Sequence, residues 1–215
     1  MGKSTLLRSL SGVQPVLDGE ISILNTSLKD LSPETLAQTI SVVLTEQPIS
    51  KNLSVTELIA LGRQPYTNWI GTLSKLDKEK ISEAITLVNL ELLKGKRCFE
   101  LSDGQLQKVL IARALAQDTP LIILDEPTTH LDMYHQAYVL KLLKKLTTET
   151  NKSILFATHE INLALQLCDK LIVMTKDFVH IGTPTELINK NVLSSIFPSD
   201  LIYFDNASVS FKIKT

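Results

Sequence analysis

Two acidic residues at the end of an apolar run have the types and spacing for magnesium and water chemistry. Asp125 and Glu126 directly follow Leu121–Leu124, and Pro127 closes the turn behind them. An apolar run of this length is typical of a buried strand, which would deliver both carboxylates into a polar turn. We expect Asp125 to hold magnesium and Glu126 to polarise an attacking water. The alternative is a pair of solvated loop acids.

The first residues of the sequence hold part of a phosphate-binding loop. Gly2-Lys3-Ser4-Thr5 matches the second half of the pattern G-x-x-x-x-G-K-[ST]. In that pattern the lysine reaches the β- and γ-phosphates, and the serine is a magnesium ligand. The N–H groups from Gly2 to Thr5 would face the phosphates where a helix begins. We therefore expect these four residues to bind nucleotide phosphates.

Two further segments carry residues that suit phosphate chemistry. Ser102, Gly104 and Gln105 stand just ahead of an amphipathic pattern, where the unpaired N–H groups of a helix start attract an anion. His159 follows another apolar run, Ile154–Ala157, at a place where a neutral imidazole can accept from water or contact a phosphate. For an isolated histidine, a polar residue at a strand end would be the preferred interpretation.

Apolar runs and helical patterns alternate along the chain, and this order must position the residues above. The alternation predicts an α/β fold with a mostly parallel sheet flanked by helices. Five strands are expected, at Ile21–Leu24, Ile40–Leu44, Leu121–Leu124, Ile154–Ala157 and Leu171–Met174.

Between Pro48 and Gly104 the strand signals give way to helical ones. Asp77 is placed to cap a helix in this stretch. Four apolar residues of that helix share one face, namely Ile81, Ala84, Ile85 and Val88. We interpret residues 48–104 as a helical subdomain inserted in the core of a single domain that spans residues 1–215. The last segment, 182–215, is expected to hold two short helices and a closing hairpin at Ser208–Ile213.

The composition excludes several classes of protein. A chain of 215 residues is long enough to bury the core of one domain, and its net charge of −1 gives no argument for nucleic acid or an anionic lipid surface. Cys98 and Cys168 lack a partner pattern and fit a reducing compartment. No apolar run approaches the ~20 residues of a membrane span, and from the first residues we expect no signal peptide. We therefore expect a cytoplasmic location.

The order of these motifs resembles a known family. Leu101–Gln105, Leu121–Glu126 and Thr128–Asp132 resemble the signature, Walker B and D-loop succession of ATP-binding-cassette (ABC) ATPases, the motors of ABC transporters. The resemblance covers nearly the whole chain. It implies a P-loop NTPase fold, ATP as substrate, Mg²⁺ as cofactor, and ATP hydrolysis.

The resemblance also implies a role for several residues in a pair of chains. Ser102, Gly104 and Gln105 would touch the γ-phosphate held by the opposite subunit, and Asp132 would lie in the loop that crosses the dimer interface. His159 resembles the switch histidine. His130 and His135 flank Asp132, and a solvated or interface role is favoured over metal ligation.

Three departures from the family pattern qualify these expectations. Asp103 stands where glycine is commoner, so its carboxylate must point away from the triphosphate or the site must weaken. The ungapped family pattern puts Glu46, or even Thr45, at the position of the expected glutamine, and Gln47 could serve with a one-residue shift. We expect Glu46 or Gln47 to fill this role, because both have an oxygen that can ligate magnesium. The first half of the phosphate loop is missing before Met1, so we expect an N-terminally truncated version that lacks its first strands.

The stretch Val55–Tyr66 resembles ATPases of importers for iron–siderophores, haem and cobalamin. The implied partners are a second copy of the chain, a membrane permease that docks on the helical subdomain, and indirectly a periplasmic or lipoprotein substrate-binding protein. Tyr66 and Trp69 are candidate permease contacts, although core packing explains them equally well. The implied location is peripheral, on the cytoplasmic face of the membrane.

Two other functions remain open from the residues. One is a soluble ABC protein that acts on ribosomes or DNA, against which the chain shows neither tandem cassettes nor a large coiled-coil insertion. The other is a fragment that cannot hydrolyse ATP because its phosphate loop is incomplete.

Overall fold

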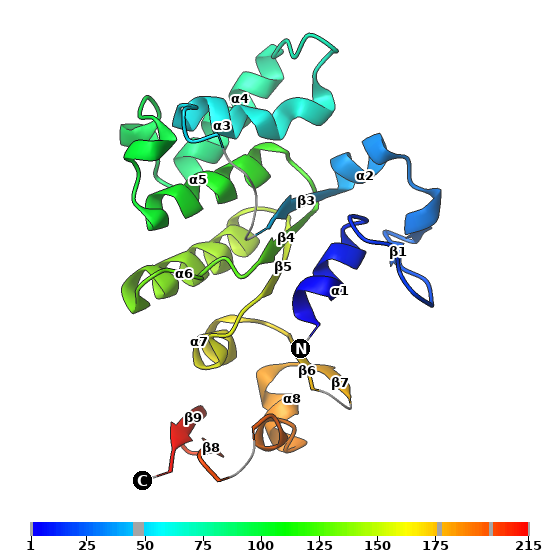
Figure 1. Ribbon diagram of the computed structural model, residues 1–215, viewed down its shortest axis with the longest axis vertical. Coiled ribbons are helices and arrows are strands. Elements are labelled where there is room, and N and C mark those ends of the chain that lie inside the picture. Colours follow the sequence, from blue (N-terminus) through cyan, green and yellow to red (C-terminus); the bar gives the residue numbers. More distant parts are fainter. Residues whose placement is uncertain (1, 45–49, 176–177, 198–199, 215) are drawn as a thin grey trace. The chain divides into compact units, whose positions relative to one another are not determined.

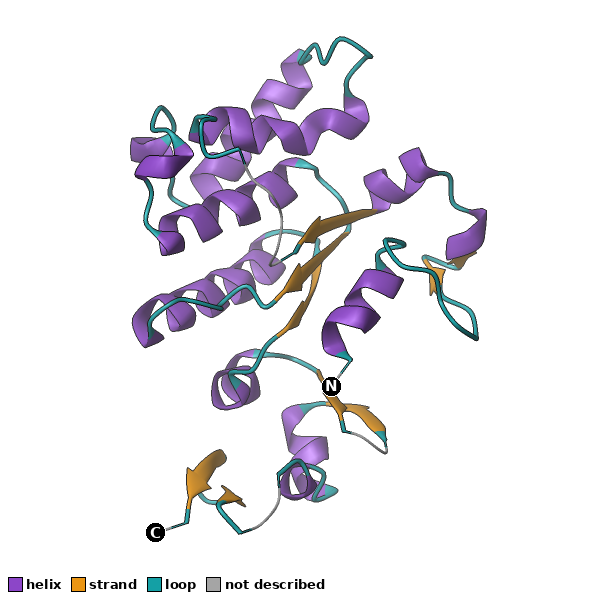
Figure 2. Ribbon diagram, in the orientation of Figure 1, coloured by secondary structure: helices purple, strands orange, loops and turns teal. Residues whose placement is uncertain are grey.

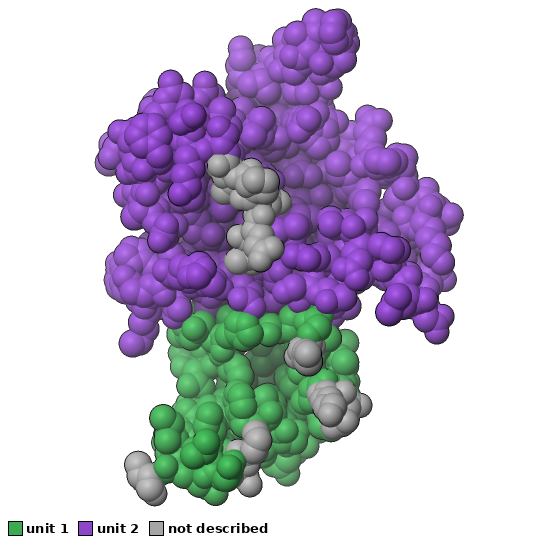
Figure 3. Space-filling model, in the orientation of Figure 1, with its two compact units in different colours: residues 1–3, 158–215 green, residues 4–157 purple. Residues whose placement is uncertain are grey.

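The computed structural model describes residues 2–44, 50–175, 178–197 and 200–214 (Figure 1). The chain forms two compact units (Figure 3). The larger unit is Ser4–Ala157, and the smaller one combines Met1–Lys3 with Thr158–Thr215.

A three-stranded parallel sheet forms the centre of the larger unit. Its strands are β3 (Ile40–Val43), β4 (Leu121–Asp125) and β5 (Ser153–Ala157), in that spatial order. The register pairs Val42 with Ile123 and Asp125 with Ala157. Strands predicted from apolar runs are therefore confirmed at these three places, and their carboxyl ends meet at one edge of the sheet.

Both faces of the sheet are covered by helices, which explains why its strands are apolar throughout. On one face, Leu7 of α1 (Lys3–Leu10) packs against Ile40, Ile123 and Ala157. Helix α6 (Met133–Glu149) lies on the other side of the sheet (Figures 1 and 2). Its buried face includes Leu140, Leu143 and Leu146, as its helical spacing predicts.

Helices α3 (Val55–Ala60) and α4 (Lys75–Leu87) lie in the stretch 48–104 that was predicted to be helical, and both pack on α5 (Asp103–Ala116), which begins at its end (Figure 2). Short 3₁₀ turns connect them, at Leu61–Tyr66 (η2), Glu91–Leu93 (η3) and Cys98–Glu100 (η4). The four residues predicted to share one face of α4 are all buried: Ile81, Ala84, Ile85 and Val88.

The predicted N-cap of α4, Asp77, lies three residues after the observed one. Ser74 is the N-cap, and its hydroxyl accepts a hydrogen bond from the N–H of Asp77. Asp77 occupies the third helical position, and its carboxylate accepts from the Ser74 N–H to complete a capping box. This arrangement leaves the other Asp77 oxygen for Arg63, whose Nε lies 2.8 Å away.

Gly62 lies very close to the backbone of α5. Helix α3 ends at Ala60, and the chain continues as η2 through Gly62. A Cβ atom at position 62 would lie 2.2 Å from the carbonyl oxygen of Arg113. Glycine is therefore needed because the backbone of α5 passes so close, and not because a helix stops there.

The predicted strand at Ile21–Leu24 is much shorter than expected. It is reduced to β1 (Ser22–Ile23), which pairs antiparallel with β2 (Thr26–Ser27) and not with the parallel sheet. Leu24 and Asn25 take positive φ angles in the tight turn between them. The chain then passes through η1 (Leu28–Asp30) and α2 (Pro33–Thr39) to reach β3.

The smaller unit has its own apolar core, formed by Leu165, Leu187, Val192, Leu193 and Phe204. Its elements are α7 (Ile161–Leu167), β6 (Leu171–Met174), β7 (Val179–Gly182), α8 (Pro184–Asn189), η5 (Leu193–Ser195), β8 (Ile202–Asp205) and β9 (Ser210–Ile213). The two short helical segments predicted after residue 182 are α8 and the 3₁₀ turn η5. The closing hairpin is present, but it begins earlier than predicted, because β8 (Ile202–Asp205) pairs with β9.

One expected strand of the parallel sheet pairs differently. The residues Leu171–Met174 do form β6, but this strand pairs antiparallel with β7. Nowhere in the described ranges is there a helix with the length and apolar character needed to cross a bilayer.

Candidate nucleotide site

Ser4 and Asp125 meet although 121 residues separate them in the sequence. The Ser4 hydroxyl donates a hydrogen bond of 3.0 Å to Oδ1 of Asp125. Ser4 lies in the first turn of α1, and Asp125 is the last residue of β4, where it is buried. The structure therefore brings together a hydroxyl and a carboxylate, two oxygen groups of the kind that Mg²⁺ prefers.

Glu126 follows at the carboxyl edge of the sheet with a constrained backbone. Its φ angle is +50°, in the left-handed region, and its N–H donates to the carbonyl of Ala157 on the neighbouring strand. The hydroxyl of Thr129 donates to its Oε2 over 3.0 Å. Such backbone conformations are unusual for residues other than glycine and concentrate at functional sites.

Lys3 and His159 contact each other within the smaller unit. The Lys3 Nζ lies 3.5 Å from Nδ1 of His159. Because an ammonium group has donors only, Nδ1 must act as the acceptor in this contact, which leaves the ring proton on Nε2. Gly2, just before Lys3, has a φ angle of +91°, which suits glycine at the turn into α1.

The segment Ser102–Gln105 is the first turn of α5 and not a stretch ahead of it. Ser102 is the N-cap, Gly104 lies inside the helix, and Gln105 completes a capping box. The Ser102 hydroxyl accepts from the Gln105 N–H, so its own proton remains able to donate to an anion. Asp103, the departure from the family pattern, is exposed at the first helical position, where the helix dipole favours a carboxylate.

Asp132 is the N-cap of α6 and is held by His135. Its Oδ1 accepts from the backbone N–H of His135 at 2.9 Å, and both of its carboxylate oxygens lie 2.9 Å from the ring Nδ1. The hydrogen bond from the backbone N–H of His135 and, after it, the one from the His135 ring lower the pKa of Asp132 below its ordinary value. For His135 the sequence favoured a solvated or interface role over metal ligation. The i, i+3 spacing from a capping aspartate is the signal that predicts its contact with Asp132.

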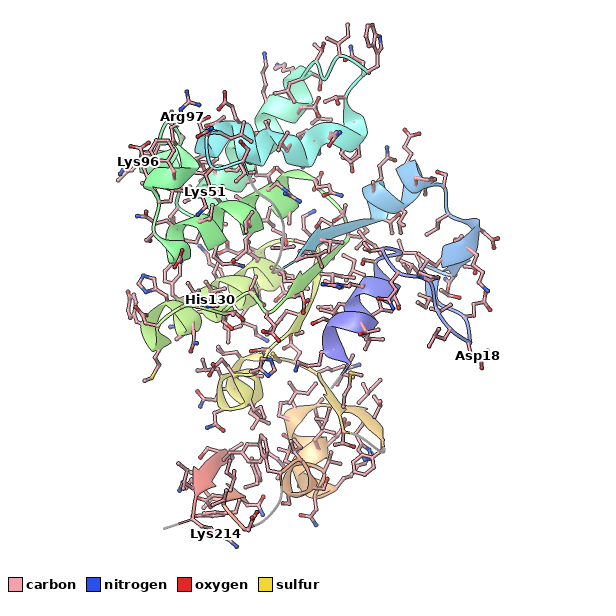
Figure 4. All side chains as sticks on the ribbon, viewed as in Figure 1. Asp18, Lys51, Lys96, Arg97, His130 and Lys214 are labelled. Atoms are coloured by element: carbon pink, nitrogen blue, oxygen red, sulfur yellow. The ribbon has the colours of Figure 1, made fainter. Side chains whose placement is uncertain are left out.

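Three basic residues gather beside the helices of the larger unit (Figure 4). Lys51, Lys96 and Arg97 lie on two segments that run together, since the N–H of Phe99 donates to the Lys51 carbonyl. The Arg97 guanidinium donates to Glu57 over 3.2 Å.

Large apolar side chains in the helical region are exposed, among them Trp69 (94%), Leu92 (96%) and Phe99 (62%).

The two candidates for the glutamine role, Glu46 and Gln47, lie outside the described residues. Among the other predicted site residues, the structure brings Ser4 together with Asp125, Lys3 with His159, and Asp132 with His135. Thr5 lies in α1 beside Ser4.

Comparison with known proteins covers most of the chain. The sequence model described as ABC transporter matches residues 1–129. The uncharacterized ABC transporter ATP-binding protein MJ0873 of Methanocaldococcus jannaschii is 38% identical over 197 residues, which cover 91% of this chain and 68% of that protein. The petrobactin import ATP-binding protein FpuD of Bacillus anthracis is 33% identical over 197 residues, covering 91% and 72% of the two chains.

A solved structure is similar over most of the fold. The dimeric post-hydrolysis state of the ATP-binding cassette MJ0796, bound to ADP and Pi, matches with a TM-score of 0.71 and 29% identity. The match covers 85% of this chain and 81% of the other.

Proposed function

This chain belongs to the ABC transporter family as an ATP-binding and ATP-hydrolysing subunit, and we propose the following roles for its residues in ATP binding and hydrolysis. Gly2, Lys3, Ser4 and Thr5 bind the phosphates of ATP. Asp125 and Ser4 hold magnesium, Glu126 polarises the attacking water, and His159 contacts the γ-phosphate or that water. The observation that carries the proposal is the Ser4–Asp125 hydrogen bond of 3.0 Å, which joins the phosphate loop to the end of β4.

Magnesium fits this pair of residues. A hydroxyl and a carboxylate are hard oxygen donors, and when bound the ion neutralises charge on the phosphates. In the part of the chain that the structure describes, no group of three or more His, Cys, Asp or Glu side chains could hold a metal ion by itself. Phosphate oxygens and water would therefore complete the coordination shell. Either Glu46 or Gln47 would add one further oxygen.

The reaction is phosphoryl transfer from ATP to water, in which positioning and charge stabilisation supply most of the catalysis. Glu126 acts as the general base and takes a proton from the attacking water. Thr129 supports this role because its hydroxyl fixes one oxygen of the Glu126 carboxylate. The Lys3–His159 contact supports a neutral His159, whose ring can accept a hydrogen bond.

The second half of the site comes from a second copy of the chain. Two copies enclose two ATP molecules, and each contributes Ser102, Gly104 and Gln105 to the nucleotide bound by the other. Asp132 lies in the loop at this interface. The dimeric form of the similar cassette MJ0796 supports the arrangement. The first turn of α5 supports it as well, because Ser102 retains a proton to donate.

The helical subdomain of residues 48–104 is the docking surface for a membrane permease, and it is part of one ABC ATPase domain. The exposure of Trp69 supports this role, because large apolar side chains left in water are common at docking surfaces. The subunit then lies peripherally on the cytoplasmic face of the membrane. A substrate-binding protein delivers an iron–siderophore, haem or cobalamin to the permease, in keeping with a relative named for petrobactin import.

Asp125→Asn tests the assignment of the metal site. The variant keeps the size of the side chain but loses its charge, so the Mg²⁺ concentration for half-maximal phosphate release should rise by about tenfold or more. Phosphate release from ATP is measured over a magnesium titration, with the exposed Asp30→Asn as a matched control. A parent chain that releases no phosphate from ATP overturns the proposed function. An unchanged titration for Asp125→Asn overturns the role of Asp125 alone.

A further inference from the structure

The side chain of His135 lies between two segments of the proposed dimer interface. Its Nδ1 is 2.9 Å from both carboxylate oxygens of Asp132, in the loop before α6. On the other side, its Cδ2 would be 2.9 Å from a Cβ atom at Gly104 in the first turn of α5. The Tyr134 ring packs nearly perpendicular to the same imidazole, with 5.5 Å between the ring centroids. One ring thus contacts both the D-loop and the signature helix.

The hydrogen bond to Asp132 fixes the orientation of this ring. A carboxylate has only acceptors when ionised, and the lowered pKa of Asp132 keeps it ionised at neutral pH. Nδ1 must therefore carry a proton and donate it, whichever state Nε2 is in. A ring with fixed orientation can hold Asp132 and cover Gly104 at the same time.

The side chain of His135 is not needed to start helix α6. The cap is formed by the backbone N–H of residue 135, which donates to Asp132 at 2.9 Å and survives any substitution except proline. The ring adds a second, separate hydrogen bond to the same carboxylate. Its contribution can therefore be removed while the helix start is kept.

We propose that His135 is a positioning residue that joins the D-loop to the signature helix, so that both act together on the ATP bound by the partner chain. This inference rests on the proposed function, which places Asp132 and Gly104 at the interface with a second copy. Its direct consequence is that the effect of His135 belongs to the partner's nucleotide and not to the nucleotide bound by its own chain.

Two amide variants distinguish the hydrogen bond from the bulk of the side chain. In His135→Asn the amide nitrogen takes the place of Nδ1 and can still donate to Asp132. In His135→Gln the amide takes the place of Nε2, too far along the side chain to make the same bond. We expect His135→Asn to retain most of the parent kcat for ATP, and His135→Gln to lose about tenfold or more, because small misplacements of reacting groups are costly.

Mixed dimers show on which nucleotide His135 acts. In the first, one chain carries both His135→Gln and Glu126→Gln, and the other is unchanged. The only competent water-activating site then receives its trans residues from the His135 variant, so hydrolysis should fall about tenfold or more below a dimer with Glu126→Gln alone in one chain. In the second, the two substitutions are on different chains. The competent site then receives intact trans residues, and its rate should match that reference dimer.

Phosphate release by the purified mixed dimers, separated by two affinity tags, gives the rates, and thermal unfolding checks that each variant folds. Equal rates in the two mixed dimers, or a larger loss in the second, overturn the inference. So does a loss in His135→Asn as large as that in His135→Gln, because it removes the hydrogen bond as the cause. An inactive parent dimer overturns the proposed function and this inference together, whereas an active parent with equal mixed dimers overturns the inference alone.

Discussion

Glu126→Gln is expected to abolish ATP turnover while ATP binding is preserved. The amide has nearly the shape of the carboxylate, and its oxygen can still accept from the Thr129 hydroxyl that now holds Oε2 at 3.0 Å. It cannot take a proton from water, and the loss of a general base costs about 10²–10⁴-fold in rate. Steady-state phosphate release measures turnover, and equilibrium binding of a fluorescent ATP analogue measures affinity.

The matched control for this variant is Glu79→Gln. Glu79 is an exposed glutamate on α4 that faces Lys75 at 3.9 Å, and the same loss of charge there should leave the rate unchanged. If Glu126→Gln hydrolysed ATP at the parent rate, another residue would have to activate the water. If it lost ATP binding as well, the carboxylate would be part of the binding site and not only the base.

Asp77→Ala is expected to cause a large decrease in the free energy of unfolding. The Arg63 Nε donates to Asp77 at 2.8 Å, and both side chains are nearly inaccessible, at 4% and 3% exposure. Arg63 also donates to the carbonyl of Ala116 at 2.8 Å, which ties η2 to the end of α5. Removing the carboxylate leaves a buried guanidinium without its counter-charge, which costs about 3–5 kcal/mol. Urea denaturation of the whole chain measures the loss.

Two controls test whether charge pairing is the cause. Replacing both residues, Arg63→Met with Asp77→Leu, removes both charges and should recover most of the lost stability. Glu79→Ala removes one member of an exposed pair on the same helix and should change the unfolding free energy by less than about 1 kcal/mol. A double variant as unstable as Asp77→Ala would contradict this explanation.

The Asp77 carboxylate should also make the stability of the folded chain depend on pH. Burial alone raises the pKa of Asp77, but the hydrogen bonds from Ser74 and Arg63 outweigh it and hold the pKa below its ordinary value. A group with a lowered pKa in the folded chain stabilises it fully above the unfolded pKa of about 4, and this stabilisation is lost as the pH falls through the folded pKa. The stability difference between the parent and Asp77→Ala should therefore shrink below about pH 4.

The sequence predicts the central sheet well because its strands are buried on both faces. The run Leu121–Leu124 is apolar at every position, since Ile123 faces α1 while Ile122 and Leu124 are buried too. The strand expected at Ile21–Leu24 has no such covering. Its apolar residues are interrupted by a tight turn at Leu24 and Asn25, which a count of apolar residues does not reveal.

The candidate site is predictable where it follows from a motif and hidden where it depends on tertiary contacts. Asp125 and Glu126 are found from the end of a buried strand, and the hydrogen bond from Ser4 to Asp125 is consistent with their expected role. The role of Asp77 is hidden because its partner Arg63 lies 14 residues away on another element. His135 is hidden for a similar reason, because its contact with Gly104 depends on how α5 and α6 pack.

Sedimentation velocity of Glu126→Gln, with the bound nucleotide counted, tests most directly the claim that two copies of this chain enclose ATP. Without turnover, the closed pair should persist as long as ATP and Mg²⁺ are present. The chain is expected to sediment as a dimer with two ATP molecules when both are added, and as a monomer when ATP is replaced by ADP. A chain that binds ATP and remains a monomer, or a dimer that forms equally with ADP, would contradict the claim.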